Sequence, residues 1–248
     1  IFSKLVGLKS DLTTKPDLAK SWTVSEDKLV YTFNLHDGVK WHDGEPFGAA
    51  DVKFSFEKIL FPLHNVGKTL QPFVKSVEAP DATTVVFTLN SPNDYFVTFV
   101  AGQGFIQPRH IYEGTDFSQN PANLRPVGTG PFKFSNWRRG QELEIVRNEN
   151  YFLKDQPYVD RIVTRFIPEP SARINALVNG EVDYVTYADL PPSMVAELRK
   201  NKDLVVTSAG HEAWGSLVEL MMNLDKEPFS KLEVRQAIAH AVNRDFII

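Results

Sequence analysis

Residues 17–47 read DLAKSWTVSEDKLVYTFNLHDGVKWHDGEPF, and this stretch combines a strand pattern with closely spaced turn signals. Large apolar side chains alternate with Val30, Thr32 and Asn34, which is the period of a half-buried β-strand. The alternating residues are Leu29, Tyr31, Phe33 and Leu35. Asp37-Gly38 and Asp43-Gly44 then mark turns. The stretch therefore predicts a strand followed by a turn-rich loop, with Trp41 and Phe47 as packing residues beside the second turn.

The next segment predicts an amphipathic helix over residues 50–60. Its apolar positions follow the helical period, and they are Val52, Phe56, Ile59 and Leu60. Asp51 lies near the positive end of this helix, and Pro62 is expected to end it. Gly48 stands where a Ser or Thr cap would be usual, at a cost of about a few tenths of a kcal/mol.

Further along, strands and helices alternate. Strands are predicted around 85–89, 132–136, 143–147, 162–167, 182–186, 204–207 and 217–224, and helices at 96–100, 171–179, 191–200 and after a capping box at 230–233. The two strands around Arg139-Gly140 should form a hairpin, and residues 162–186 read as a βαβ-like run. The turn-rich residues 119–131 are the best candidate for a subdomain boundary. This order indicates a mixed α/β architecture with two or more subdomains.

Composition narrows the class of protein. The 27 basic and 31 acidic residues among 248 are interspersed, which argues against a nucleic-acid-binding stripe. There is no cysteine, so disulfides, thiol catalysis and thiolate metal sites are excluded. Apolar runs fall far below the ~20 residues that span a bilayer.

The sequence opens at Ile1 without Met and stops inside a helical pattern at Ile248, so we expect a fragment. Apolar residues of the last helix should then be exposed or buried against a second copy of the chain. These are Leu232, Ile238 and Val242.

Residues 17–47 closely resemble the signature of the bacterial extracellular solute-binding proteins of family 5, the peptide/nickel family of ABC importers. Three further blocks agree in order and spacing, namely 126–132, 157–183 and 222–237. The resemblance covers essentially all of this chain and about the first half of a typical member. It implies a two-lobed fold of the type II periplasmic-binding-protein kind, here mostly the first lobe with its extra subdomain and a truncated second lobe. Residues 1–20 and 130–224 would belong to the first lobe, 21–129 to the extra subdomain, and 225–248 to the start of the second lobe.

Motifs for catalysis or metal binding are incomplete. Gly128-Thr129-Gly130 lacks the third glycine of a phosphate-binding loop, and Gly215 replaces the second histidine that would complete a zinc-protease motif begun at His211-Glu212. The remaining histidines lack close metal-ligand spacing, although distant ones could converge, as the nickel-binding relatives suggest. They are His36, His42, His64, His110 and His240. No nucleophile elbow is present, so we expect no enzyme and no cofactor.

Ligand contacts are expected along residues 210–223, which in the family run beside the hinge and line the cleft. Trp214 is the first candidate because an aromatic side chain at a hinge offers a large apolar contact, with core packing as the alternative. The other candidates are His211, Gly215 and Asn223 in the same segment, and Phe61, His64 and Phe105 in loops that resemble the cleft edge of the extra subdomain.

The resemblance implies the solute-binding component of an ABC importer, which passes a small solute to the transmembrane subunits of a permease. Its expected location is periplasmic or extracellular, and a lipid anchor on the full-length protein is an open alternative. Peptides come first as the solute, with nickel chelates and oligosaccharides as alternatives. A ligand sensor or chaperone on the same fold is the main rival function, and a hydrolase is a weaker one.

Overall fold

The computed structural model describes residues 1–186, 190, 192–207, 209 and 219–243. The chain divides into two units, Ile1–Gly210 and His211–Ile248. Among the described residues the first unit holds three sheets, and every strand pair in them is antiparallel. The smallest sheet pairs β1 (Val6–Leu8) with β2 (Thr14–Pro16).

The four-stranded sheet confirms the alternation seen in the sequence. Its order is β3 (Ala19–Val24), β4 (Val30–Leu35), β6 (Thr84–Leu89) and β5 (Val74–Glu78). Tyr31 lies opposite Phe87, and Phe33 lies opposite Val85. In both central strands every second residue is buried, so one face of the sheet is apolar and must be covered.

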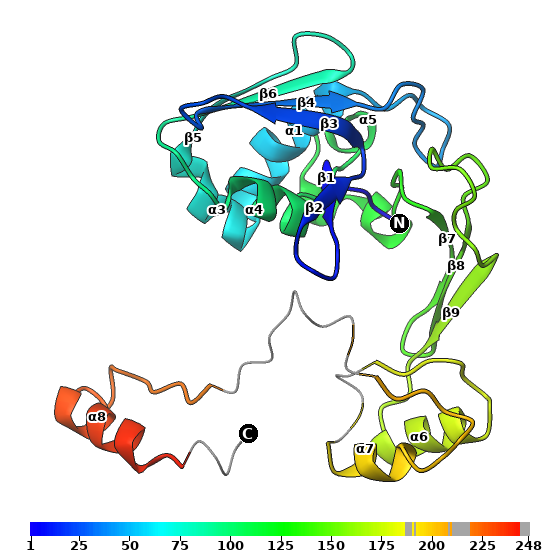
Figure 1. Ribbon diagram of the computed structural model, residues 1–248, viewed down its shortest axis with the longest axis vertical. Coiled ribbons are helices and arrows are strands. Elements are labelled where there is room, and N and C mark those ends of the chain that lie inside the picture. The colour runs from blue at the N-terminus through cyan, green and yellow to red at the C-terminus, as the bar shows by residue number, and fades with distance from the viewer. Residues whose placement is uncertain (187–189, 191, 208, 210–218, 244–248) are drawn as a thin grey trace. The chain divides into compact units, whose positions relative to one another are not determined.

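Helices cover that face (Figure 1). They are α1 (Ala49–Phe54), a π-helix (Ser55–Leu60), α2 (Phe61–Leu63), α3 (Asn65–Leu70), a 3₁₀ turn (Gln71–Phe73) and α4 (Phe96–Gln103). The rings of Phe33, Phe56 and Phe96 all meet the ring of Phe87 edge-on, with centroids 5.7, 4.9 and 5.1 Å from it. Edge-to-face pairs of this kind add about 0.5–1.5 kcal/mol each to simple burial.

The prediction that Pro62 ends the first helix is wrong. Helical backbone runs on through α2 to Leu63 before α3 begins at Asn65. The turn before the proline widens into a π-helix, in which Phe61 N–H donates to the Phe56 carbonyl, five residues earlier. A proline normally breaks a helix because it lacks an N–H and its ring clashes with the carbonyl four residues before it. The wider turn accommodates this residue without ending the helix.

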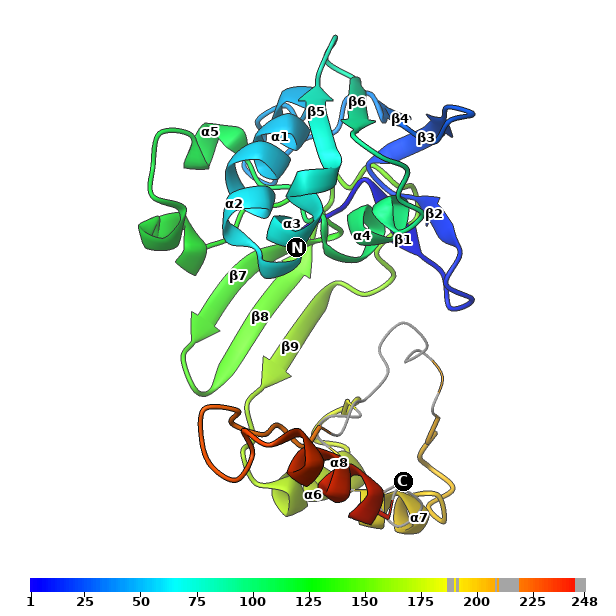
Figure 2. The same cartoon turned by 90° about the vertical axis from the view of Figure 1, so that its left-hand side faces the viewer.

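The hairpin predicted around Arg139-Gly140 is confirmed. β7 (Phe132–Arg138) pairs with β8 (Glu142–Arg147), and β8 pairs with β9 (Arg161–Arg165), so the three strands lie side by side (Figure 2). Short helical segments precede this sheet. They are α5 (Arg109–Tyr112) and two 3₁₀ turns, Phe117–Gln119 and Pro121–Leu124.

The strands predicted at 182–186 and 204–207 are not formed, and residues 219–224 are irregular as well, with 217 and 218 outside the described residues. The predicted βαβ-like run is therefore wrong, although its helix exists as α6 (Pro170–Val178) and is followed by α7 (Pro192–Leu198). In the part of the chain that the structure describes, no strand pairs with these segments. A strand without a hydrogen-bonded neighbour is not stable in water, whatever its side-chain pattern.

The second unit contributes α8 (Leu232–Ala241) among its described residues. The predicted capping box is wrong, because Lys231 is the cap residue and no side chain caps the helix. No residue of α8 is buried, Leu232 is exposed, and Ile238 and Val242 are half-buried. Self-association through this helix stays a prediction, as do the proposed domain boundaries.

Candidate ligand-binding site

The first residues of the chain lie between two loops that are distant in sequence. Gly130 N–H donates to the Ile1 carbonyl at 2.7 Å, and Ile106 N–H donates to the Ser3 carbonyl at 3.1 Å. A Cβ atom at either Gly128 or Gly130 would overlap with the Ile1 carbonyl. The glycines at 128 and 130 are therefore explained by a close backbone approach to the N-terminal segment.

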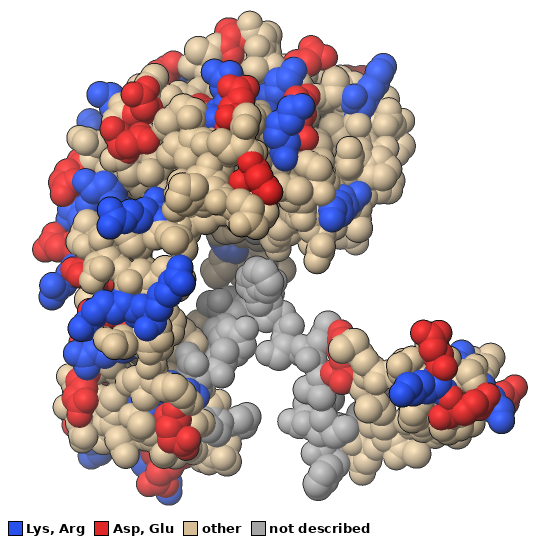
Figure 3. All heavy atoms as spheres, turned by 180° about the vertical axis from the view of Figure 1, so that it is seen from behind, with Lys and Arg blue, Asp and Glu red and all other residues tan. Residues whose placement is uncertain are grey.

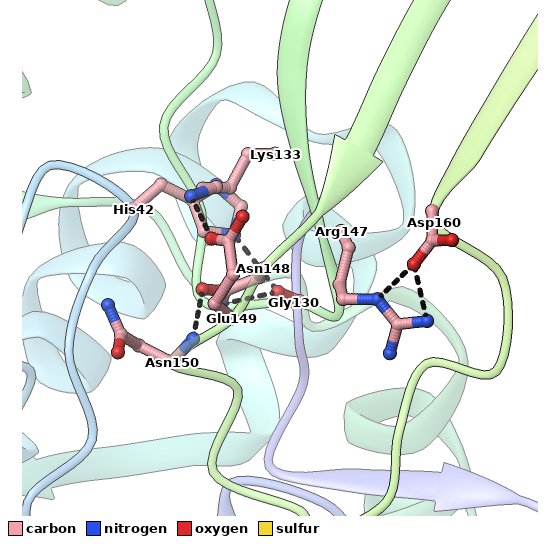
Figure 4. Close-up of polar contacts among 8 residues, drawn as sticks. All are labelled: His42, Gly130, Lys133, Arg147, Asn148, Glu149, Asn150 and Asp160. Carbon is pink, nitrogen blue, oxygen red and sulfur yellow. Dashed lines mark hydrogen bonds and ion pairs between the residues drawn. The ribbon is translucent and has the colours of Figure 1, made fainter.

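His42 joins the signature stretch to the same loop (Figure 4). Its Nδ1 atom accepts from Gly128 N–H at 3.1 Å, so the proton sits on Nε2, which donates to the Gly130 carbonyl at 3.0 Å. Asn148 Nδ2 donates to the same carbonyl at 3.0 Å. Burial lowers the pKa of His42, and the neutral ring is the form that these two hydrogen bonds require.

These contacts favour a structural role for the signature. The Gly128 and Gly130 N–H groups already have protein acceptors, so the loop does not present them to a phosphate, in agreement with the sequence prediction. Trp41 is 2% exposed and packs edge-on against Phe47, as predicted. A cavity of about 380 Å³ lies beside the junction, but its Lys133 pairs with Glu149 at 2.6 Å and its Asp43 pairs with His110 at 2.8 Å.

Lys4 and Phe105, the neighbours of Ser3 and Ile106, contact each other through their side chains. The Lys4 ammonium lies over the Phe105 ring, 4.8 Å from its centroid. Lys4 is half-buried, whereas Phe105 keeps 40% of its surface exposed. A cation over an aromatic face is attracted by the ring quadrupole. The structure thus places Phe105, one of the predicted ligand residues, on the surface next to a charged group.

Asp17 lies next to Lys4, and the charge of Asp17 in turn acts on Tyr151. Asp17 accepts the Lys4 main-chain N–H at 3.0 Å, and burial raises the pKa of its carboxyl group although the Lys4 N–H bond and charge oppose this. Burial, and next to it the Asp17 charge, raise the pKa of Tyr151 to about 12. Burial also lowers the pKa of Lys4, with Asp17 opposing. The shifts of Asp17 and Lys4 indicate that solvation of charge is reduced around this segment.

Two other predicted residues lie in or near the core. Phe61 is 5% exposed and packs edge-on against Phe56, so little of its ring is available to a ligand. His64 is half-buried between α2 and α3, and its buried Nδ1 atom has no hydrogen-bond partner. A role for Phe61 and His64 in ligand binding stays a prediction.

The hinge segment is mostly outside the described residues. His211, Trp214 and Gly215 all fall there, and the predictions for them stay open. Asn223 is described and exposed, and its side-chain oxygen accepts from Asp225 N–H at 3.0 Å in a local turn. Sequence reasoning missed Lys4, because nothing in a local pattern pairs residue 4 with residue 105.

Lys and Arg side chains are interspersed with Asp and Glu on the face drawn in Figure 3. Among the residues that the structure describes, no three His, Asp or Glu side chains are placed to hold a metal ion. Within those same residues, no helix is long and apolar enough to cross a membrane.

Comparison with known proteins shows to which family the chain is related. The sequence profile of the bacterial extracellular solute-binding proteins, family 5, matches residues 13–248. The chain belongs to family 5. Among curated members, heme-binding protein A of Haemophilus influenzae is 33% identical and matches 100% of this chain but 48% of its own length. The chain thus spans about half the length of the curated relatives it matches.

Solved structures of family 5 proteins agree with this fold. NikZ from Campylobacter jejuni, in complex with Ni(L-His), superposes with a TM-score of 0.83 at 33% identity, covering 100% of this chain and 48% of NikZ. The periplasmic binding protein DppA from Helicobacter pylori, in complex with the peptide STSA, gives 0.81 at 30% identity, with 100% and 52% covered. The expected type II binding-protein fold, present as a partial lobe, is confirmed.

Proposed function

We propose that the chain is part of the solute-binding component of an ABC importer, which captures a peptide or similar small solute and delivers it to a membrane permease. The observation that carries the proposal is the match over residues 13–248, supported by solute-bound structures with TM-scores above 0.8. The family's position outside the cytoplasm supports a periplasmic or extracellular location, and a lipid anchor is part of the proposal.

The solutes held by two relatives support the proposed solute class. The peptide in DppA and the L-histidine in NikZ are both small, and both carry a carboxylate. We put peptides first, nickel chelates of amino acids second and oligosaccharides third. Coupling to transport requires that the solute bind the closed form of the full-length protein more tightly than the open form, because equal affinity shifts no population.

A thermal-shift screen of the full-length protein that contains this chain tests the proposal. The probes are dipeptides, oligopeptides, Ni(L-His) and oligosaccharides, compared between wild type and Trp214→Ala. A solute at 100 times its dissociation constant should stabilise the native state by about 2.7 kcal/mol. We expect one class to raise the melting temperature, and Trp214→Ala to reduce that rise.

Uptake separates transport from its rivals. Deletion of the gene should abolish uptake of the labelled solute, and the wild-type gene should restore it. Binding without any effect on uptake would favour a ligand sensor, and protection of unfolded client proteins without solute binding would favour a chaperone. Turnover of the bound solute by the purified protein would favour a hydrolase.

A further inference from the structure

We infer that Lys4 and Phe105 form a subsite for a ligand carboxylate with an apolar group next to it. This rests on the proposed function, because it names the chemistry of the solute that the same protein would capture. The pair is not part of the signature stretch or of any sequence motif.

The two side chains are held in place by the main chain. Ile106 N–H donates to the Ser3 carbonyl, so the residues on either side of this bond, Phe105 and Lys4, are neighbours. The Lys4 N–H donates to Asp17 at 3.0 Å and the Lys4 carbonyl accepts from Leu18 N–H at 3.0 Å. Both main-chain polar groups of Lys4 are therefore satisfied, and its side chain is not needed to hold the segment.

The approach of the loop to the core also fixes Phe105. A Cβ atom at Gly104 would lie 2.7 Å from the Val100 carbonyl and 3.2 Å from the Phe56 ring. Glycine at 104 lets the loop sit against α4 and Phe56, and the next residue then projects its ring to the surface. A pre-positioned ring of this kind loses little entropy when a ligand packs on it.

The Lys4 ammonium is poorly satisfied for a half-buried charge. Among the described residues it makes no ion pair or hydrogen bond, and its named contact is the face of the Phe105 ring. Asp17, whose charge acts on Lys4, uses its Oδ2 atom on the Lys4 main-chain N–H. An ammonium has three N–H donors, and a ligand carboxylate can accept from them in a charge-assisted bond.

The ring defines the rest of the ligand. With 40% of its surface exposed beside the ammonium, Phe105 offers an apolar contact adjacent to the charge. A solute with a carboxylate one or two bonds from an apolar group fits both, as in the C-terminal residue of a peptide. A neutral oligosaccharide could stack on the ring but would leave the ammonium without an anion.

A matched pair of small probes tests the subsite without the natural solute. The probes are 3-phenylpropionate and 3-phenylpropanamide, titrated into the full-length protein labelled with [¹⁵N]phenylalanine. The Phe105 amide signal is assigned by its loss in Phe105→Leu. We expect the acid to shift this signal with a dissociation constant about tenfold lower than that of the amide, the size of one charge-assisted hydrogen bond.

Three variants decide whether the preference belongs to Lys4. Lys4→Met keeps the length of the side chain without its charge and should reduce the acid-to-amide ratio to about one, whereas Lys4→Arg should keep it. Lys75→Met removes an exposed charge from β5, so it changes net charge equally and should leave the ratio unchanged.

Equal binding of acid and amide to wild type, no shift of the Phe105 signal, or a ratio that survives Lys4→Met would overturn the subsite. An equal fall of the ratio in Lys75→Met would also overturn it, because the effect would then be one of net charge. The outcome is independent of the solute screen and of uptake. A carboxylate preference in a protein that transports nothing would retain the subsite and remove the proposed function.

Discussion

Residues 19–100 and the strands predicted within residues 161–207 carry similar side-chain alternation, but only the strands of the first region are part of the large core cluster. Among the described residues of the second region, the buried apolar side chains lie on α6 and α7, and they are Ile174, Ala176 and Leu198. In the four-stranded sheet, Phe33, Val85 and Phe87 are fully buried beneath the helices. In the second region every residue of β9 is exposed, and Tyr184 and Val205 keep 75% and 93% of their surface. An alternating pattern records which faces a segment can bury, and burial itself requires a partner element. The first region finds its partners nearby in sequence.

The largest expected effect comes from removing a phenylalanine ring in each region and comparing the losses of stability. Phe87→Ala removes a fully buried ring that touches three other aromatic rings, so it should lower the free energy of unfolding by about 3–5 kcal/mol. Phe166→Ala makes the same change directly after β9, where the ring is 46% exposed, and should cost less than about 1 kcal/mol. Urea denaturation of the 248-residue chain measures both. Equal losses would mean that the second region contributes as much core as the first.

Sequence reasoning succeeded where the determining contacts are local. The strands at 30–35 and 84–89, the hairpin around Arg139-Gly140 and the helix from Phe96 follow from period and turn residues within each segment. It failed at 182–186 and 204–207, where strand formation depends on a neighbour that the segment does not encode. It also failed at Pro62, where a wider helical turn accommodated the proline.

The candidate site divides along the same line. Phe105 could be proposed from the sequence because the resemblance places it in a loop at the cleft edge. Lys4 could not, because its position over the Phe105 ring depends on a hydrogen bond from Ile106 to Ser3. The role of His42 could not be predicted from the sequence either, because its two hydrogen-bond partners lie 86 and 88 residues further along the chain.

A substitution of His42 should have an intermediate effect on stability, and it tests whether the two regions unfold independently of each other's contacts. His42→Ala removes two hydrogen bonds between the signature stretch and the 128–130 loop, and should cost about 1–3 kcal/mol. Since the second region has no part in these bonds, Phe166→Ala and His42→Ala should be additive to within about 0.5 kcal/mol. Urea denaturation of the two single variants and the double variant checks this, and strong coupling would contradict the separation of the regions.

The pH dependence of the same junction has a definite sign. Because the pKa of His42 is lower in the folded state than its ordinary value of about 6.5, its contribution to stability is fully present above that pH and is lost as the pH falls toward the folded pKa. Protonation would place a hydrogen on Nδ1, facing the Gly128 N–H. His42→Gln can keep an acceptor and a donor without titrating. As the pH falls below 6.5, the unfolding free energy of wild type should therefore decrease relative to that of His42→Gln. Asp17 and Asp51 titrate in both proteins, so their contributions cancel in this difference.

The smallest expected effect lies at the start of α1, inside the well-packed region. Gly48 N–H donates to the Asp51 carboxylate at 3.0 Å, and the same carboxylate accepts from Arg109 N–H at 3.1 Å. A Cβ atom at position 48 would lie 3.1 Å from the Ala82 carbonyl, so any side chain there meets a close contact. Gly48→Ala adds this contact alone, whereas Gly48→Ser adds it together with a hydroxyl that can cap the helix.

Gly48→Ser should therefore be more stable than Gly48→Ala by about 1 kcal/mol, and should stay within about 0.5 kcal/mol of wild type, as measured by thermal unfolding. The comparison with alanine cancels the shared contact with Ala82 and isolates the cap. If the two variants unfold at the same temperature, the serine hydroxyl gains no hydrogen bond, and the Asp51 carboxylate already supplies what this helix start requires. That result would mean that the contacts around the start of α1 are already complete, so a better helix cap adds no stability there. The well-packed first region would then differ from the second region even at the level of a single residue.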